Sequence, residues 1–166
     1  MDNQNNKSGL AGLIQKGGVF AGIPGTNPRE VLTSLLEIIP LPASAPRGEL
    51  LKAVLEREAL MSTAIGCGIA LPHPRNPLVS RDEEQFLIIA FLKNPVDWRA
   101  LDSLPVHTAL LAVSSSPKQH LRTLSEINFF CQQESFRELL VKRSPQERII
   151  KVIQEAERAW KSTTLS

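Results

Sequence analysis

Apolar residues along this chain form short unbroken runs that alternate with helical stripes, a pattern that predicts strands interleaved with helices. Three runs are expected to be buried strands, because they are continuous, largely β-branched or aromatic, and bounded by turn residues: Val19–Ile23, Phe86–Leu92 and Val106–Val113. A shorter strand is expected over Ile69–Leu71. The alternation of strands and helices predicts an α/β fold with a largely buried sheet.

Apolar residues recur at helical spacing in five further segments, which we expect to be helices. These helices are predicted at about 28–39, 48–60, 117–131, 134–143 and 145–161. The first opens with Asn27–Glu30 (NPRE), an N-cap followed by proline and by an acid three residues after the cap. Ser116–Gln119 (SPKQ) and Ser144–Glu147 (SPQE) predict capping boxes of the same kind.

The predicted helix at 48–60 carries two charges on or beside its buried side. Leu51, Val54 and Leu55 form its expected apolar stripe. Glu58 continues this stripe, and Arg57 lies at its edge. Both charges therefore stand close to the glycine-rich segment that follows the helix.

Composition narrows the classes of function. The chain has 166 residues, a formal net charge of +2 and only 5% aromatic residues, and its basic residues are scattered. This composition argues against binding to nucleic acid and against insertion into a membrane. Two isolated cysteines, no signal-like N-terminus and no long apolar run favour a reduced, cytoplasmic setting. We expect residues 1–9 to be disordered and residues 10–160 to form one domain.

His73 is the first candidate for chemistry. It stands between Pro72 and Pro74, which restrict its backbone to an extended conformation at the end of the predicted Ile69–Leu71 strand. Ligands in α/β sheets commonly bind near the carboxyl ends of strands. The alternative is an ordinary surface loop that happens to contain a histidine.

His120 is the second candidate, because it lies in the first turn of a well-capped helix. The positive end of the helix dipole favours an anion there and disfavours protonation of the ring. The alternative is a histidine that merely faces solvent. His107 lies inside an apolar strand run and is expected to be packed there without a functional role.

Several other chemistries are not supported by the spacing of residues. Cys67, His73, His120 and Cys131 lack the short separations of a structural zinc site, so no metal is expected. The glycine-rich segment matches neither the dinucleotide-binding fingerprint nor a P-loop, so no cofactor is expected. The sequence also lacks the G-x-S-x-G motif of serine hydrolases. A set of three residues remains: His73 in its restricted loop, His120 on a helix, and Arg57. Together they are suited to carrying a phosphoryl group on a histidine nitrogen.

Two segments resemble a known family. EREALMSTAIGCGIALPHPR (Glu56–Arg75) resembles the active-site segment of the enzyme IIA domains of the mannitol/fructose class, in the phosphoenolpyruvate-dependent phosphotransferase system. DSLPVHTALLAVSSSPKQHLRTLSEI (Asp102–Ile127) resembles the family's second segment, in which a helix-borne histidine precedes a leucine. The resemblance implies a mixed sheet flanked by helices on both faces, and a transferase that acts as a carrier with a phosphohistidine intermediate.

By position, the resemblance makes His73 the phosphorylated residue, with His120 and Arg57 beside the phosphoryl group. The matching Arg-Glu and Ser-Thr pairs add Glu58, Ser62 and Thr63 as supports of the pocket. The implied donor is the phosphocarrier protein HPr or its nitrogen-branch counterpart, and the implied acceptor is a IIB domain or a regulatory target. A IIA domain without fused partners favours the nitrogen-regulatory subgroup over a sugar-transport component.

The chain departs from the family pattern at two positions: Pro74 replaces a glycine or alanine, and Cys67 replaces a frequent asparagine. Pro74 removes one backbone N–H from the neighbourhood of the phosphoryl group, and Cys67 is expected to lie next to the site. Two other functions remain open on the sequence alone. One is a regulatory docking module, switched by phosphorylation or independent of it, and the other is an anion-binding protein without transfer activity.

Overall fold

A computed structural model describes residues 9–164 of the chain, so residues 1–8 of the segment expected to be disordered lie outside the described residues. The predicted alternation of strands and helices is confirmed, and the fold is a single α/β domain. In chain order the elements are α1 (Leu10–Gly17), β1 (Gly18–Ile23), α2 (Pro28–Ile38), α3 (Arg47–Leu60), β2 (Ala64–Gly66), β3 (Ile69–Ala70), the 3-10 turn η1 (Asp82–Glu84), β4 (Phe86–Val96), β5 (Val106–Val113), α4 (Pro117–Cys131), α5 (Glu134–Val141) and α6 (Gln146–Thr164).

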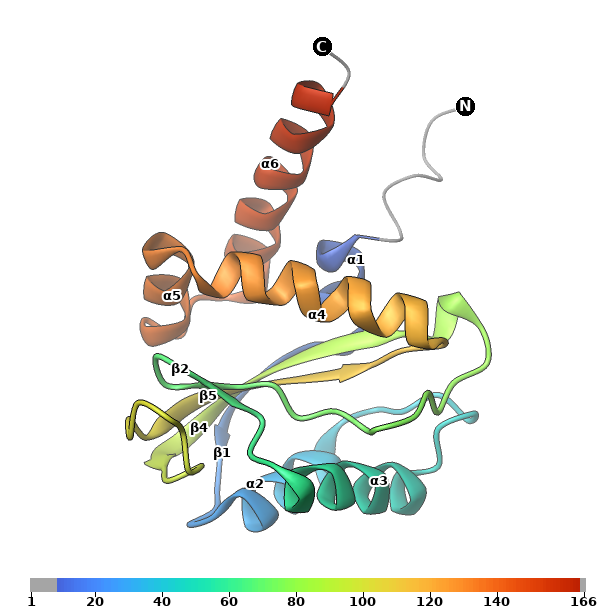
Figure 1. Ribbon diagram of the computed structural model, residues 1–166, viewed down its shortest axis with the longest axis vertical. Coiled ribbons are helices and arrows are strands. Elements are labelled where there is room, and N and C mark those ends of the chain that lie inside the picture. Colours follow the sequence, from blue (N-terminus) through green and yellow to red (C-terminus); the bar gives the residue numbers. More distant parts are fainter. Residues whose placement is uncertain (1–8, 165–166) are drawn as a thin grey trace.

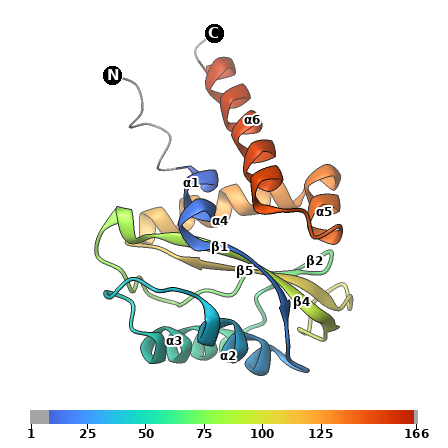
Figure 2. The same ribbon diagram turned by 180° about the vertical axis from the view of Figure 1, so that it is seen from behind.

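The five strands form one mixed sheet in the order β1-β4-β5-β3-β2. β1 is parallel to β4 and β3 is parallel to β5, whereas the central pair β4–β5 and the edge pair β2–β3 are antiparallel. Figures 1 and 2 show α2 and α3 on one face of the sheet and α1, α4, α5 and α6 on the other. Helices therefore cover both faces, as the resemblance implied.

The two central strands carry the core. Residues 86–92 and 108–113 are buried without interruption, because alternate side chains of each strand enter two separate apolar layers. One layer lies against α2 and α3, and the other lies against the remaining helices. Within residues 9–164, no helix has the length and apolar character needed to cross a bilayer.

Two of the predicted helix starts are confirmed in detail. The Asn27 side chain accepts a hydrogen bond from the backbone N–H of Glu30, and the Ser116 hydroxyl accepts one from Gln119, so both residues act as N-caps. The capping box predicted at Ser144 is wrong. α6 begins at Gln146, and the Ser144 hydroxyl caps no backbone N–H of the described chain.

Several predicted boundaries shift for identifiable reasons. β4 continues to Val96, four residues beyond the predicted end at Leu92. The apolar stripe of α3 was predicted to be Leu51, Val54 and Leu55. In the structure, Leu50 and Val54 are fully buried, whereas Leu51 and Leu55 are only half-buried. α5 ends at Val141, before a backbone turn at Arg143.

The helix α1 was not predicted. Its sequence, LAGLIQKG, contains two glycines and lacks a capping side chain at Gly9. Its apolar side chains are buried against β4, and a Cβ atom at Gly17 would come within 2.1 Å of the Leu87 carbonyl oxygen. This close approach requires glycine and holds α1 directly on the sheet.

Candidate active site

The segment that carries His73 is fixed to the sheet by backbone hydrogen bonds. The Leu71 N–H donates to the Thr63 carbonyl, and the Ala112 N–H donates to the Pro72 carbonyl at 3.2 Å. β3 itself pairs with β5 in parallel register, with Ile69 opposite Thr108. The chain therefore leaves the sheet just before His73, at the end of the short strand as the sequence predicted, and the structure places this point beside the carboxyl end of β5.

The His73 side chain is buried and held in one orientation. It is 8% exposed, and its Nδ1 lies 2.6 Å from the Leu71 carbonyl oxygen. Because a carbonyl only accepts hydrogen bonds, Nδ1 carries the proton. Burial lowers the pKa of His73 below its ordinary value; the hydrogen bond to Leu71 opposes this shift, and the charge of Arg57 adds to it. The ring is thus favoured as a neutral imidazole with its lone pair on Nε2.

His120 is brought next to His73 by the packing of α4 on the sheet. The two ring centroids are 4.8 Å apart and the rings are inclined by 50°. Burial lowers the pKa of His120, and the nearby His73 and Arg57 lower it further. Since α4 begins at Pro117, His120 lies near the positive end of the helix dipole, which favours an anion close to the two rings.

Arg57, in the last turn of α3, is the third residue of this cluster. One of its terminal nitrogens, Nη1, donates to the Met61 carbonyl at 2.7 Å, which leaves its other N–H groups available. Its charge lowers the pKa of both histidines. The three residues selected from the sequence thus come from α3, from the loop after β3 and from α4, and their charges influence one another.

Glu58 joins α3 to the segment before β2 and to the β4–β5 connection. Its carboxylate accepts hydrogen bonds from the Thr63 N–H (2.9 Å), the Thr63 hydroxyl (2.6 Å) and the Trp98 indole N–H (2.9 Å). The Ser62 hydroxyl donates to the Trp98 carbonyl and accepts from the Ala64 N–H. These polar groups are satisfied within the protein, so they hold the segment that leads into the site.

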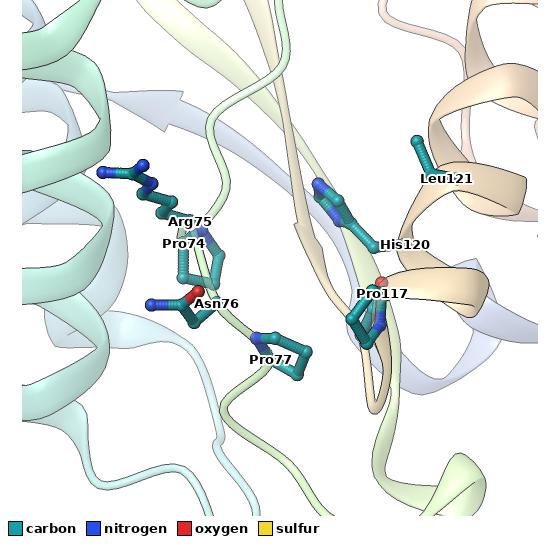
Figure 3. A pocket seen from close by; sticks show the side chains of 8 residues that line it. Pro74, Arg75, Asn76, Pro77, Pro117, His120 and Leu121 are labelled. Carbon is teal, nitrogen blue, oxygen red and sulfur yellow. The ribbon is translucent and has the colours of Figure 1, made fainter.

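A cavity of about 360 Å³ adjoins His120. It lies between the loop that follows His73 and the start of α4, and its lining includes Arg75, Asn76 and Leu121. Figure 3 shows His120 extending from α4 toward the loop, whereas Arg75 extends away toward α3. Arg75 and Asn76 were not predicted as site residues, although their position directly after Pro74 was a usable signal.

Cys67 does not lie next to the site, contrary to expectation. It occupies the turn between β2 and β3, where the Gly68 carbonyl accepts from His107 near the start of β5. His73 lies beside Ala112, five residues further along β5, which places the two regions about 16 Å apart at ~3.3 Å per residue.

His107 is packed, as expected. Its Nδ1 lies 2.7 Å from the Thr108 hydroxyl, and a Cβ atom at Gly68 would approach its ring to 2.4 Å. Residues 9–164 contain no cluster of three His, Cys, Asp or Glu side chains placed to bind a metal ion.

The sequence of this chain is similar to those of known proteins. Residues 13–156 match the family model described as "Phosphoenolpyruvate-dependent sugar phosphotransferase system, EIIA 2". A fructose-specific EIIABC component of the phosphotransferase system from Bacillus subtilis is 32% identical over 63% of this chain, and a nitrogen regulatory protein from Bradyrhizobium diazoefficiens is 36% identical over 46%. The aligned regions span 16% and 49% of those two relatives.

The fold is also similar to that of solved structures. The nitrogen regulatory protein IIA-Ntr from Neisseria meningitidis superposes with a TM-score of 0.69 at 22% identity, covering 81% of this chain and 92% of that one.

Proposed function

Because this chain belongs to the EIIA 2 family of the phosphoenolpyruvate-dependent sugar phosphotransferase system, we propose that it carries a phosphoryl group on His73. The donor would be HPr or its nitrogen-branch counterpart. The acceptor would be a IIB domain, or the phosphorylated form would itself act as a regulatory signal. The observation that carries the proposal is a buried histidine with a fixed tautomer, 4.8 Å from a second histidine.

The tautomer selects Nε2 as the nucleophile. Since Nδ1–H donates to the Leu71 carbonyl, the lone pair of the neutral ring is on Nε2. In the transfer, the Nε2–P bond forms while the P–N bond to the donor's histidine breaks, and the bonding electrons return to the donor nitrogen. His73 keeps its Nδ1 proton, and the Leu71 carbonyl stabilises the positive charge that develops on the ring.

Arg57 and His120 would stabilise the transferred group. Phosphoryl transfer requires positioning and compensation of the charge on three oxygens. A neutral His120 ring can donate one N–H to such an oxygen, and Arg57 supplies a permanent positive charge from α3. Glu58, Ser62 and Thr63 would act as positioning residues, because their bonds fix the segment between Arg57 and His73.

The proposal is tested by intact-protein mass spectrometry after incubation with phosphoenolpyruvate, enzyme I and HPr. We expect a gain of one acid-labile phosphoryl group that is absent in His73→Ala. His107→Ala is the matched control, because His107 is packed at the other end of β5, and it should still accept the group. An unmodified wild-type protein, folded and mixed with active HPr, would refute the proposal.

Exposed apolar side chains beside the site favour a second candidate, a docking module. Leu60 is 65% exposed, Met61 71% and Leu121 68%, and these residues lie at the end of α3 and the start of α4, next to Arg57 and His120. A surface of this kind is typical of protein interfaces. If docking is independent of phosphorylation, affinity for the partner will be equal in wild type, His73→Ala and His73→Asp.

A further inference from the structure

Three consecutive serines join β5 to α4, and the first of them keeps a free hydroxyl. The Ser115 hydroxyl donates to the Asp82 carboxylate, and the Ser116 hydroxyl accepts from the Gln119 N–H as the cap of α4. The Ser114 hydroxyl makes no hydrogen bond with any part of the described chain, although this residue is only 4% exposed and is the most buried of the three. The two neighbouring hydroxyls thus have structural partners, and the one at Ser114 does not.

Ser114 lines the cavity of about 360 Å³ that adjoins His120. Solvent reaches the serine oxygen, and because the residue is otherwise enclosed, it does so from this cavity. The other polar side chains of the lining, apart from His120, are Arg75 and Asn76, and Figure 3 shows both on the side of the loop that faces α3. The Ser114 hydroxyl is therefore the uncommitted polar group of this lining beside His120.

The sheet places His73 and Ser114 on the same face. Leu71 and Ala112 both enter the apolar layer on the α4 side, and side chains two residues further along each strand point the same way. This direction agrees with the contact between the two histidine rings. The Ala112 N–H donates to the Pro72 carbonyl, so the two chains run side by side. With strands ~4.8 Å apart and a rise of ~3.3 Å per residue, the α-carbons of His73 and Ser114 lie about 8 Å apart, close enough for a phosphoryl group to lie between their side chains.

The transfer site has room for one more hydrogen-bond donor. A phosphoryl group in transfer spreads its charge over three oxygens, and the donors assigned above are Arg57 and His120. Pro74, directly after His73, has no backbone N–H to offer to the third oxygen. A hydroxyl can donate there without adding a charge to a site in which burial already disfavours protonated histidines.

We infer that Ser114 is a third residue that binds the phosphoryl group during transfer, an inference that rests on the proposed function of His73. The serine O–H would donate to one phosphoryl oxygen while the bond from Nε2 of His73 to phosphorus forms and the P–N bond to the donor's histidine breaks. The bonding electrons return to the donor nitrogen. Ser114 keeps its proton and forms no bond to phosphorus, so it stabilises the transferred group and takes no part in the bond changes.

The test is the rate of transfer from phospho-HPr to the full chain, followed by quenched flow. Ser114→Ala should slow the transfer at least tenfold. Ser114→Thr and Ser114→Val have the same shape and differ in the hydroxyl, so the threonine variant should transfer at least tenfold faster than the valine variant. Ser115→Ala is the matched control, because its hydroxyl is bonded to Asp82, and it should transfer as wild type does.

The ³¹P NMR spectrum of the phosphorylated protein separates contact with the phosphoryl group from a structural role. The phosphohistidine resonance should move in Ser114→Ala and stay in place in Ser115→Ala. An unmoved resonance, normal transfer by Ser114→Ala, equal rates for the threonine and valine variants, or equal slowing by Ser115→Ala would overturn the inference and leave the proposed function standing. A wild-type protein that takes up no phosphoryl group would overturn both.

Discussion

Glu58→Ala should destabilise the fold strongly, because one carboxylate accepts hydrogen bonds from three donors. Two of the donors belong to Thr63, which is 5% exposed, and the third is the indole N–H of Trp98, which is 1% exposed. A hydrogen bond to a charged group contributes about 1.5–3 kcal/mol. The three bonds share one partly exposed acceptor and are not additive, so we expect a loss of about 3 kcal/mol in the free energy of unfolding.

Urea unfolding followed by circular dichroism measures this loss. With a slope of about 2 kcal/mol per molar urea, the midpoint should fall by about 1.5 M. The control is Glu56→Ala in the same helical turn. Its pair with Lys52, at 3.9 Å, joins side chains that are 67% and 77% exposed, so its removal should cost less than about 0.5 kcal/mol. A loss below about 1 kcal/mol for Glu58→Ala, or one equal to that of Glu56→Ala, would refute the reasoning.

Three further predictions concern the site. The pKa values of His73 and His120 are both lowered, so the unfolded chain takes up protons near pH 6.5 while these two residues of the folded chain do not. The free energy of unfolding, measured by urea titration at each pH, should therefore fall as the pH drops from 7 to 5. The double variant His73→Gln/His120→Gln should show a weaker dependence on pH. An unchanged slope would contradict it. His120→Ala should slow transfer from phospho-HPr by roughly 10²-fold in quenched-flow assays while leaving the far-ultraviolet circular dichroism unchanged, and a loss of the folded spectrum would instead assign a structural role. Met61→Asp and Leu121→Asp should weaken partner binding, measured by calorimetry, at least tenfold without affecting stability, whereas unaltered affinity would exclude this surface as the interface.

Four of the five strands of the described chain, all except β2, and most helices could be predicted from the sequence because their signals are local. The continuous apolar runs of β4 and β5 and the caps at Asn27 and Ser116 each depend on a few neighbouring residues. α1 could not be predicted, because its stability comes from contact with β4 and not from its own glycine-containing sequence. The boundary of α6 was misjudged because the backbone at Arg143 adopts a conformation unusual for arginine.

The sequence singled out the candidate site residues but not how they lie together. The proline pair around His73 and the first-turn position of His120 marked these two residues as candidates, and the pairing of β3 with β5 and the packing of α4 bring them together. Two features escaped the sequence analysis because they depend on contacts between distant elements. These are the three hydrogen bonds accepted by Glu58 and the placement of Cys67 at the far end of the sheet.

The bond between His73 and the Leu71 carbonyl has a consequence for the order of events in transfer. Turning the ring over would break this bond and leave a buried carbonyl unpaired, so the ring cannot act as a swinging arm. A phosphoryl group on Nε2 would leave in the direction from which it arrived. Donor and acceptor must then occupy the same face in succession, and each would competitively inhibit the binding of the other.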